Sequence, residues 1–311
     1  MKNNKYFIIT IDTEADNQWN LNQECTTENA KYLPKFQELA EKYGYKPVWL
    51  TTYEMANDEN FVKYFKQKQE KGLCEMGMHL HAWNTPPYYK LEKMTNERSY
   101  LIEYPVNIME KKIKMLDKLL TEKFGIKPIS HRAGRWVMND NYFKLLKKYN
   151  YKIDCSVTPH INWKKALGQL GTHGSNYANS CERAYMINDS VLEVPMTIRK
   201  SHTFQIKRIK NIKRFFREIE LFIIGRNQWI RPDGDFAING MIDVIKKCNR
   251  NNEYIMFMIH SSELMPGGSP NFKDEKSIEK LYNVIEEIFK YTNDLGYIGV
   301  TLREFNNIYN K

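Results

Sequence analysis

Two histidines placed two residues apart, His79 and His81, close a short apolar segment that begins at Gly72. Side chains alternate between the faces of a strand, so both imidazoles would point to the same side. A desolvated imidazole needs a partner for each ring nitrogen, and a divalent cation satisfies two imidazoles at once. Alone, this spacing fits metal ligands and also ordinary partly exposed histidines. The other ionisable residues must distinguish the two interpretations.

Further ionisable residues follow other apolar segments. They are Asp12 and Glu14 after 6–11, Arg132 and Arg135 after 127–130, Asp154 within 151–155, and His260 after 254–259. In parallel α/β folds the carboxyl ends of the strands carry the active site. A single strand-end aspartate often caps a helix, and a single arginine often forms a surface ion pair. Because such residues recur at several strand ends, we expect them to share one rim.

The residue types suit hydrolysis of an amide or an ester. One carboxylate and two imidazoles form a three-ligand open site, typical of catalytic zinc or a similar divalent ion. A second carboxylate two residues away can take a proton from water, and Arg132 would keep that carboxylate ionised. His260 can then donate a proton to the leaving group.

The elements that would position these residues alternate along the chain. Predicted strands cover 6–11, 47–52, 72–78, 127–130, 151–155, 191–195, 254–259 and 297–301, and predicted helices cover 27–43, 59–71, 105–124, 140–149, 206–223, 236–248 and 274–295. This alternation predicts an α/β fold whose parallel sheet closes into a barrel or is doubly wound. We expect a single domain over 1–311, with insertions at about 84–104 and 159–235.

Composition limits the class of protein. The chain has 311 residues, 42% of them hydrophobic, which is enough for a sizeable core. Lys and Arg number 47 against 37 Asp and Glu, and this net charge of +10 favours anionic partners such as a glycan, a lipid headgroup or nucleic acid. No nucleic-acid recognition module is visible, so we expect no nucleic-acid partner.

Cysteine usage and hydropathy indicate a cytoplasmic protein. The five cysteines are odd in number and show no CxxC spacing, as expected of free thiols in a reducing compartment. The apolar run after Lys5 stops at Asp12 without a cleavage site, so we expect no signal peptide. No apolar stretch approaches the roughly 18 residues that a membrane span needs.

Four motifs, in this order, resemble those of the NodB-homology polysaccharide deacetylases, or carbohydrate esterase family four. They are Thr10–Glu14, Gly77–Trp83, His131–Trp136 and Ile259–Leu264, and Gly296–Phe305 resembles the last strand and turn of the family. The WbmS-like branch, associated with surface polysaccharides, resembles the chain most, over about residues 5 to 306. The resemblance implies a distorted (β/α)7 barrel and metal-dependent de-N-acetylation of a sugar.

The resemblance also implies roles for individual residues. Asp12 matches the catalytic base of the family, Arg132 the residue that tethers the base, and His260 the acid. The chain departs from the family at Thr13, where the family has a second aspartate, and at Trp83, where it has a second histidine.

Other residues must therefore complete the ligand set. We expect Glu14, by same-face geometry, and His81 to join His79 as ligands of a divalent metal, most simply Zn²⁺. Asp16 and Asp12 remain alternative carboxylate ligands. Trp83, Arg135 and Trp136 are expected to contact the substrate, although these aromatics could equally be core residues.

The resulting hypothesis is a cytoplasmic de-N-acetylase acting on an amino sugar of a surface-polysaccharide, lipid-linked or nucleotide-linked glycan intermediate. The alternative is a non-catalytic carbohydrate-binding barrel that has lost its metal, because two motifs are altered. The basic helix predicted at 206–217 is expected to present a solvated face. It could otherwise lie on an anionic membrane, which would place the protein peripherally on the inner membrane face.

Overall fold

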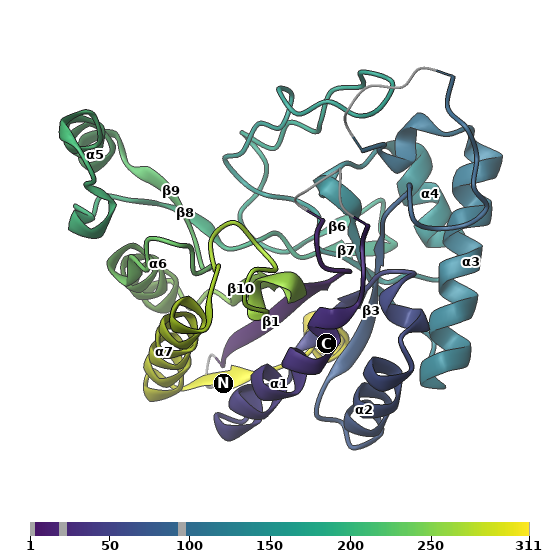
Figure 1. Ribbon diagram of the computed structural model, residues 1–311, viewed down its shortest axis with the longest axis horizontal. Coiled ribbons are helices and arrows are strands. Elements are labelled where there is room, and N and C mark those ends of the chain that lie inside the picture. The colour runs from purple at the N-terminus through teal and green to yellow at the C-terminus, as the bar shows by residue number, and fades with distance from the viewer. Residues whose placement is uncertain (1–3, 19–23, 93–97, 311) are drawn as a thin grey trace.

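A strongly curved, mainly parallel sheet forms the centre of the protein (Figure 1). The computed structural model describes residues 4–18, 24–92 and 98–310; residues 93–97 of the expected 84–104 insertion therefore lie outside the described residues. The parallel strands follow the order β10-β1-β2-β3-β4-β5-β7. Their bounds are β10 (Ile255–His260), β1 (Lys5–Thr13), β2 (Val48–Thr51), β3 (Glu75–Leu80), β4 (Ser130–Ala133), β5 (Ile153–Asp154) and β7 (Val191–Glu193).

Two further strands complete this sheet. β6 (Tyr185–Ile187) pairs antiparallel with β7, and β11 (Tyr297–Gly299) pairs parallel with the beginning of β1. β1 from Phe7 onward and all of β3 are buried, as expected for parallel strands covered on both faces. The arrangement confirms the predicted α/β fold, an open and distorted barrel of the (β/α)7 type.

Helices pack around the outside of the sheet (Figure 1). They are α1 (Leu33–Lys42), α2 (Glu59–Glu70), α3 (Val106–Phe124), α4 (Asp140–Lys148), α6 (Ile238–Arg250) and α7 (Glu275–Asp294), whereas α8 (Leu302–Tyr309) packs against the interior of the barrel. Short 3-10 turns are η1 (Glu28–Tyr32), η2 (Met55–Asn57), η3 (Leu101–Glu103), η4 (Gly134–Trp136), η5 (Ile206–Arg208) and η6 (Ser261–Leu264). Side-chain caps fix several helix starts: Asp58 accepts from the Phe61 N–H, and Asn139 from the Tyr142 N–H.

Side-chain alternation along β1 divides the core. Phe7, Ile9 and Ile11 pack outward against the helices, whereas Ile8 packs into the barrel. The barrel interior below the site is apolar, and Leu302 and Phe305 of α8 contribute to it. Asp12 shares the inward face of β1 with Ile8, at the carboxyl end of the strand. Strand periodicity therefore places an aspartate at the mouth of the barrel.

The expected insertion at 159–235 contains an arm that projects from the barrel. Strands β8 (Ile198–Ser201) and β9 (Arg226–Trp229) form an antiparallel ribbon, and α5 (Ile212–Ile224) lies at its tip (Figure 1). The predicted start of this helix at 206 is wrong, because Asn211 caps α5 by accepting from the Arg214 N–H. None of the helices in the described part of the chain is long and apolar enough to cross a bilayer.

Candidate active site

A cleft of about 500 Å³ opens at the carboxyl ends of the barrel strands. Eight of the nine residues predicted from sequence to form the site line it: Asp12, Glu14, His79, His81, Trp83, Arg135, Trp136 and His260. The ninth, Arg132, is fully buried and contacts Asp12 from within the barrel. The structure thus brings together side chains that lie as far apart in the chain as Asp12 and His260.

Three side chains in the cleft form a potential metal-binding group. Nε2 of His81 lies 3.1 Å from Nε2 of His79 and 3.3 Å from Oε2 of Glu14. The three ligand atoms lie within 4.8 Å of one another, and all three residues are buried. This donor set suits a divalent cation such as zinc, which takes imidazole nitrogen and carboxylate oxygen ligands.

Neighbouring groups orient this set. His79 Nδ1 lies 3.0 Å from the Arg132 carbonyl oxygen, so its N–H donates there and Nε2 keeps its lone pair. The His81 ring stacks on Trp83 at a centroid distance of 4.3 Å. Gly134 lies against the His81 ring and the Leu80 backbone, because a Cβ at Gly134 would lie 2.9 Å from that ring and 2.5 Å from the Leu80 carbonyl oxygen.

The end of β1 is anchored so that Glu14 faces the histidines. The Glu14 N–H donates to Ser261 Oγ over 2.9 Å, and the Ser261 hydroxyl donates back to the Glu14 carbonyl over 2.8 Å. Asn29 donates to both acceptors. The alternative ligand Asp16 instead accepts hydrogen bonds from the backbone and hydroxyl of Thr26. Glu14 is therefore the carboxylate that the fold directs toward His79 and His81.

The protonation states of Glu14, His79 and His81 suit metal binding. Burial, with a smaller effect of Asp12, raises the pKa of Glu14 well above its usual value. Burial lowers the pKa of His79 to about 4 and holds that of His81 well below its usual value. The imidazoles are thus neutral near neutral pH, as metal ligands must be, and a cation would stabilise the buried carboxylate.

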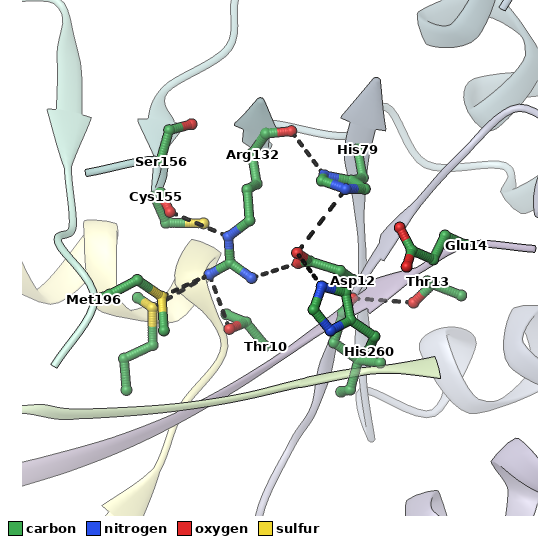
Figure 2. Close-up of polar contacts among 12 residues, drawn as sticks. Thr10, Asp12, Thr13, Glu14, His79, Arg132, Cys155, Ser156, Met196 and His260 are labelled. Carbon is green, nitrogen blue, oxygen red and sulfur yellow. Dashed lines mark hydrogen bonds and ion pairs between the residues drawn. The ribbon is translucent and has the colours of Figure 1, made fainter. Parts of the chain in front are cut away.

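Asp12 forms a buried ion pair with Arg132 (Figure 2). Its Oδ1 lies 2.5 Å from Nη1 of Arg132, whose other nitrogens donate to the Cys155 carbonyl and to Thr10. Burial raises the pKa of Asp12, but the charge of Arg132 and smaller effects of His79 and His260 outweigh it, so this pKa lies below its usual value. Asp12 is therefore ionised, and its Oδ2 lies 3.9 Å from His79 Nε2.

His260 contacts Asp12 on the side of the carboxylate away from His79 (Figure 2). Its Nε2 lies 3.8 Å from Asp12 Oδ2, and its Nδ1 lies 3.1 Å from Oε2 of Glu263. Arg231 donates to both Glu263 oxygens over 2.9 Å. Burial alone would raise the pKa of Glu263. Lowering effects, of which the charge of Arg231 is the largest, outweigh burial and bring this pKa to about 2. Ionised Glu263 accepts the Nδ1 hydrogen, which directs Nε2 into the cleft.

Sequence reasoning missed Arg231 and gave Glu263 no role. Arg231 follows β9 in the irregular insertion, where no periodic pattern marks it. Glu263 does lie three residues after His260, at the spacing of a capping box. That spacing was the available signal for a carboxylate next to the histidine.

The remaining predicted residues pack within the rim. The Trp136 ring lies 4.9 Å from the Arg132 guanidinium, which buries this cation under an aromatic face. Arg135 lies 4.4 Å over the Tyr100 ring and donates to the Leu167 carbonyl. Arg98 and Trp163 also line the cleft and were not predicted.

Comparisons with known proteins identify the fold. No protein-family model matches the chain, and no curated protein sequence matches it. A solved structure from Parabacteroides distasonis, described as a glycoside hydrolase/deacetylase, aligns with a TM-score of 0.60 at 12% identity over 99% of this chain and 71% of that one. Puue allantoinase aligns with a TM-score of 0.56 at 10% identity over 97% and 88% of the two chains.

A third similar structure comes from Mycobacterium smegmatis and is described as a polysaccharide deacetylase. It aligns with a TM-score of 0.55 at 12% identity, over 99% of this chain and 91% of that one. The alignments cover nearly the whole chain, so the chain has the fold of the NodB-homology type that its motifs predict. At such identities the likeness concerns the fold, and the argument for activity comes from the cleft.

Proposed function

We propose that this protein is a metal-dependent de-N-acetylase of the NodB-homology family, in its WbmS-like branch, and that it hydrolyses the acetamide of an amino sugar. One observation carries the proposal. The Glu14, His79 and His81 group shares a cleft with the ionised carboxylate of Asp12 and with Nε2 of His260. These are the ligands, the base and the acid that amide hydrolysis needs, and they come from three separate parts of the chain.

Glu14, His79 and His81 would hold the metal, for which Zn²⁺ suits the mixed oxygen and nitrogen ligands. When bound, the ion would supply Lewis-acid polarisation of the acyl carbonyl oxygen. The Arg132 carbonyl and the Trp83 ring fix the two imidazoles in place. This second layer of contacts limits reorganisation of the ligands during turnover.

Asp12 acts as the general base. Its Oδ1 is held by Arg132, so Oδ2 is the oxygen available to accept a proton from the attacking water. Arg132 keeps the pKa of Asp12 below its usual value against the effect of burial, so the base is unprotonated at neutral pH. Attack forms the bond between the water oxygen and the acyl carbon.

His260 acts as the general acid. Glu263 accepts from Nδ1, so a proton on Nε2 points into the cleft toward the departing nitrogen. Transfer of this proton accompanies cleavage of the C–N bond and releases acetate and the free amine. Asp12 is ionised and His260 Nε2 lies 3.8 Å from its Oδ2, so the group that removes a proton and the group that delivers one line the same part of the cleft.

We further propose a substrate from surface-polysaccharide synthesis, carried on a lipid or a nucleotide. Trp83 packs between the His81 ring and the Arg98 guanidinium, whereas Trp136 and Trp163 line the cleft and offer apolar faces for sugar rings. Arg98 and Arg135 line it as well, which favours a substrate with negative charge such as a linking phosphate. All five cysteines are free thiols, which supports a cytoplasmic location.

An acetate-release screen over nucleotide-linked and lipid-linked N-acetylamino sugars, combined with elemental analysis, tests the proposal. We expect stoichiometric divalent metal and acetate release in the wild type, and neither in His79→Ala. His173→Ala is the matched control, because His173 is exposed and outside the cleft. Sugar binding without metal or acetate release, also after zinc is added, would show a binding barrel instead of an enzyme.

A further inference from the structure

Helix α5 presents an apolar surface to solvent at the tip of the β8–β9 ribbon (Figure 1). Ile212 is 66% exposed, Phe216 63% and Ile223 68%. Isolated exposed apolar side chains are ordinary, but a group of them on one helix marks an interaction surface. The residues from 212 to 223 follow helical spacing, and the structure shows that their apolar face is turned outward.

Six apolar residues of α5, all exposed except the half-buried Ile219, form a continuous stripe. Ile212, Phe216, Ile219 and Ile223 recur every three to four positions and so lie along one side of the helix, with Phe215 and Phe222 beside them. We call these six residues the α5 stripe. The side of α5 that faces the ribbon carries Glu218, which is buried and pairs with Arg226 of β9 over 2.5 Å. This ion pair fixes the orientation of the helix and therefore of the stripe. The stripe is therefore part of the folded arm.

Basic side chains lie beside the stripe, as Lys213 does, and on the opposite side of the helix, as Arg214 does. Lys213 and Arg214 are exposed and form no ion pair among the described residues, whereas Arg217 pairs with Glu220 over 2.6 Å. Lys207, in η5 just before the helix, is exposed as well. An amphipathic helix with Phe and Ile on one face and Lys and Arg beside it suits the interface of an anionic bilayer.

We infer that α5 docks this protein on an anionic lipid membrane. The α5 stripe enters the boundary between headgroups and acyl chains, and the charges of Lys213 and Arg214 attract α5 to anionic headgroups. A second copy of the chain would also cover Phe216 and Ile223. It would leave the charges of Lys213 and Arg214 without partners, whereas an anionic membrane satisfies both features. The inference does not depend on the proposed hydrolysis.

Co-sedimentation with lipid vesicles tests the inference. The wild-type chain is incubated with phosphatidylcholine vesicles and with vesicles that also contain phosphatidylglycerol. We expect pelleting with the anionic vesicles and recovery in the supernatant with the neutral ones. Lys213→Gln/Arg214→Gln should bind the anionic vesicles about 30-fold more weakly, from the contribution of each basic side chain near such a surface. Phe216→Glu/Ile223→Glu should weaken binding by at least about 100-fold.

Matched controls change exposed residues elsewhere. Lys111→Gln/Lys114→Gln removes the same charge from α3, and Val106→Glu/Ile126→Glu introduces glutamate at two exposed apolar positions. Both controls should pellet like the wild type. The inference is overturned if the wild type stays in the supernatant with anionic vesicles, or if the α5 variants bind as it does. A wild-type dimer in sedimentation equilibrium that Phe216→Glu/Ile223→Glu dissociates would also overturn it, because the stripe would then cover itself.

Discussion

Replacing Glu263 by glutamine isolates the group that orients the proposed acid. Glu263 is fully buried, and the charge of Arg231 outweighs the effect of burial to hold its pKa at about 2. A carboxylate whose pKa falls on folding contributes stability that is present above the unfolded pKa and is lost as the pH falls through the folded pKa. The stabilisation therefore declines between about pH 4.5 and pH 2.

The size of this effect follows from the pKa difference. A fall from 4.5 to about 2 corresponds to about 3 kcal/mol at neutral pH and to about 1.4 kcal/mol at about pH 3. Glu263→Gln should thus lose about 3 kcal/mol of unfolding free energy at about pH 7, and less than half of that at about pH 3. We also expect turnover to fall by about 10²-fold, because the Nδ1 hydrogen of His260 then has at best a neutral amide oxygen as its acceptor in place of a carboxylate.

Urea unfolding of both proteins at the two pH values, with acetate release at neutral pH, measures these effects. Glu75→Gln is the matched control, because Glu75 is also buried but burial raises its pKa. Glu75→Gln loses one of the hydrogen bonds that Glu75 accepts from Ser130 and Arg303. Because a raised pKa destabilises the fold at neutral pH, this deficit should not shrink as the pH falls, and turnover should be unchanged. A Glu263→Gln deficit that stays the same between the two pH values would refute the electrostatic reasoning. Unchanged turnover would remove Glu263 from the mechanism.

Three other substitutions probe separate parts of the account. His260→Ala should keep the metal and slow acetate release by about 10²–10⁴-fold; normal turnover would exclude His260 as the acid. Arg132→Met leaves buried Asp12 without its counter-ion, so we expect a loss of about 3–5 kcal/mol in urea unfolding and a shift of the acidic limb of the pH–rate profile to higher pH. An unmoved limb would mean that Arg132 does not set the pKa of the base. Lys112→Met removes the donor to the carbonyls of Ala82, Thr85 and Pro87, and should lower the unfolding free energy by about 2–4 kcal/mol with metal binding retained; equal stability would contradict this.

Local patterns were sufficient to predict a parallel α/β sheet and most of the rim, whereas the barrel was predicted from the resemblance to a family. β1 and β3 are continuous apolar segments, and the side-chain period of a strand fixes which residues share a face. That period placed His79 with His81, and Asp12 with Glu14, before any contact was known. The parallel pairing of β1 with β10 then places His260 beside Asp12, because these two residues are partners in the register.

Features that depend on tertiary neighbours could not be predicted from the sequence. Arg231 reaches His260 from the arm, and no spacing links the two residues. Helical periodicity in α5 identified an amphipathic helix, but which face is covered depends on what packs behind it, and Arg226 holds Glu218 there. The ring of Trp136 covers Arg132 through a turn in which Arg135 and Trp136 have φ of 57° and 63°, a conformation that their residue types disfavour.

Calorimetric titration of zinc into protein stripped of metal by a chelator tests the central claim most directly. If Glu14, His79 and His81 form one metal centre, the wild type and His173→Ala bind zinc stoichiometrically, whereas His79→Ala and Glu14→Gln lose this binding. Wild-type protein that binds no zinc, or zinc binding that survives His79→Ala, would contradict the account.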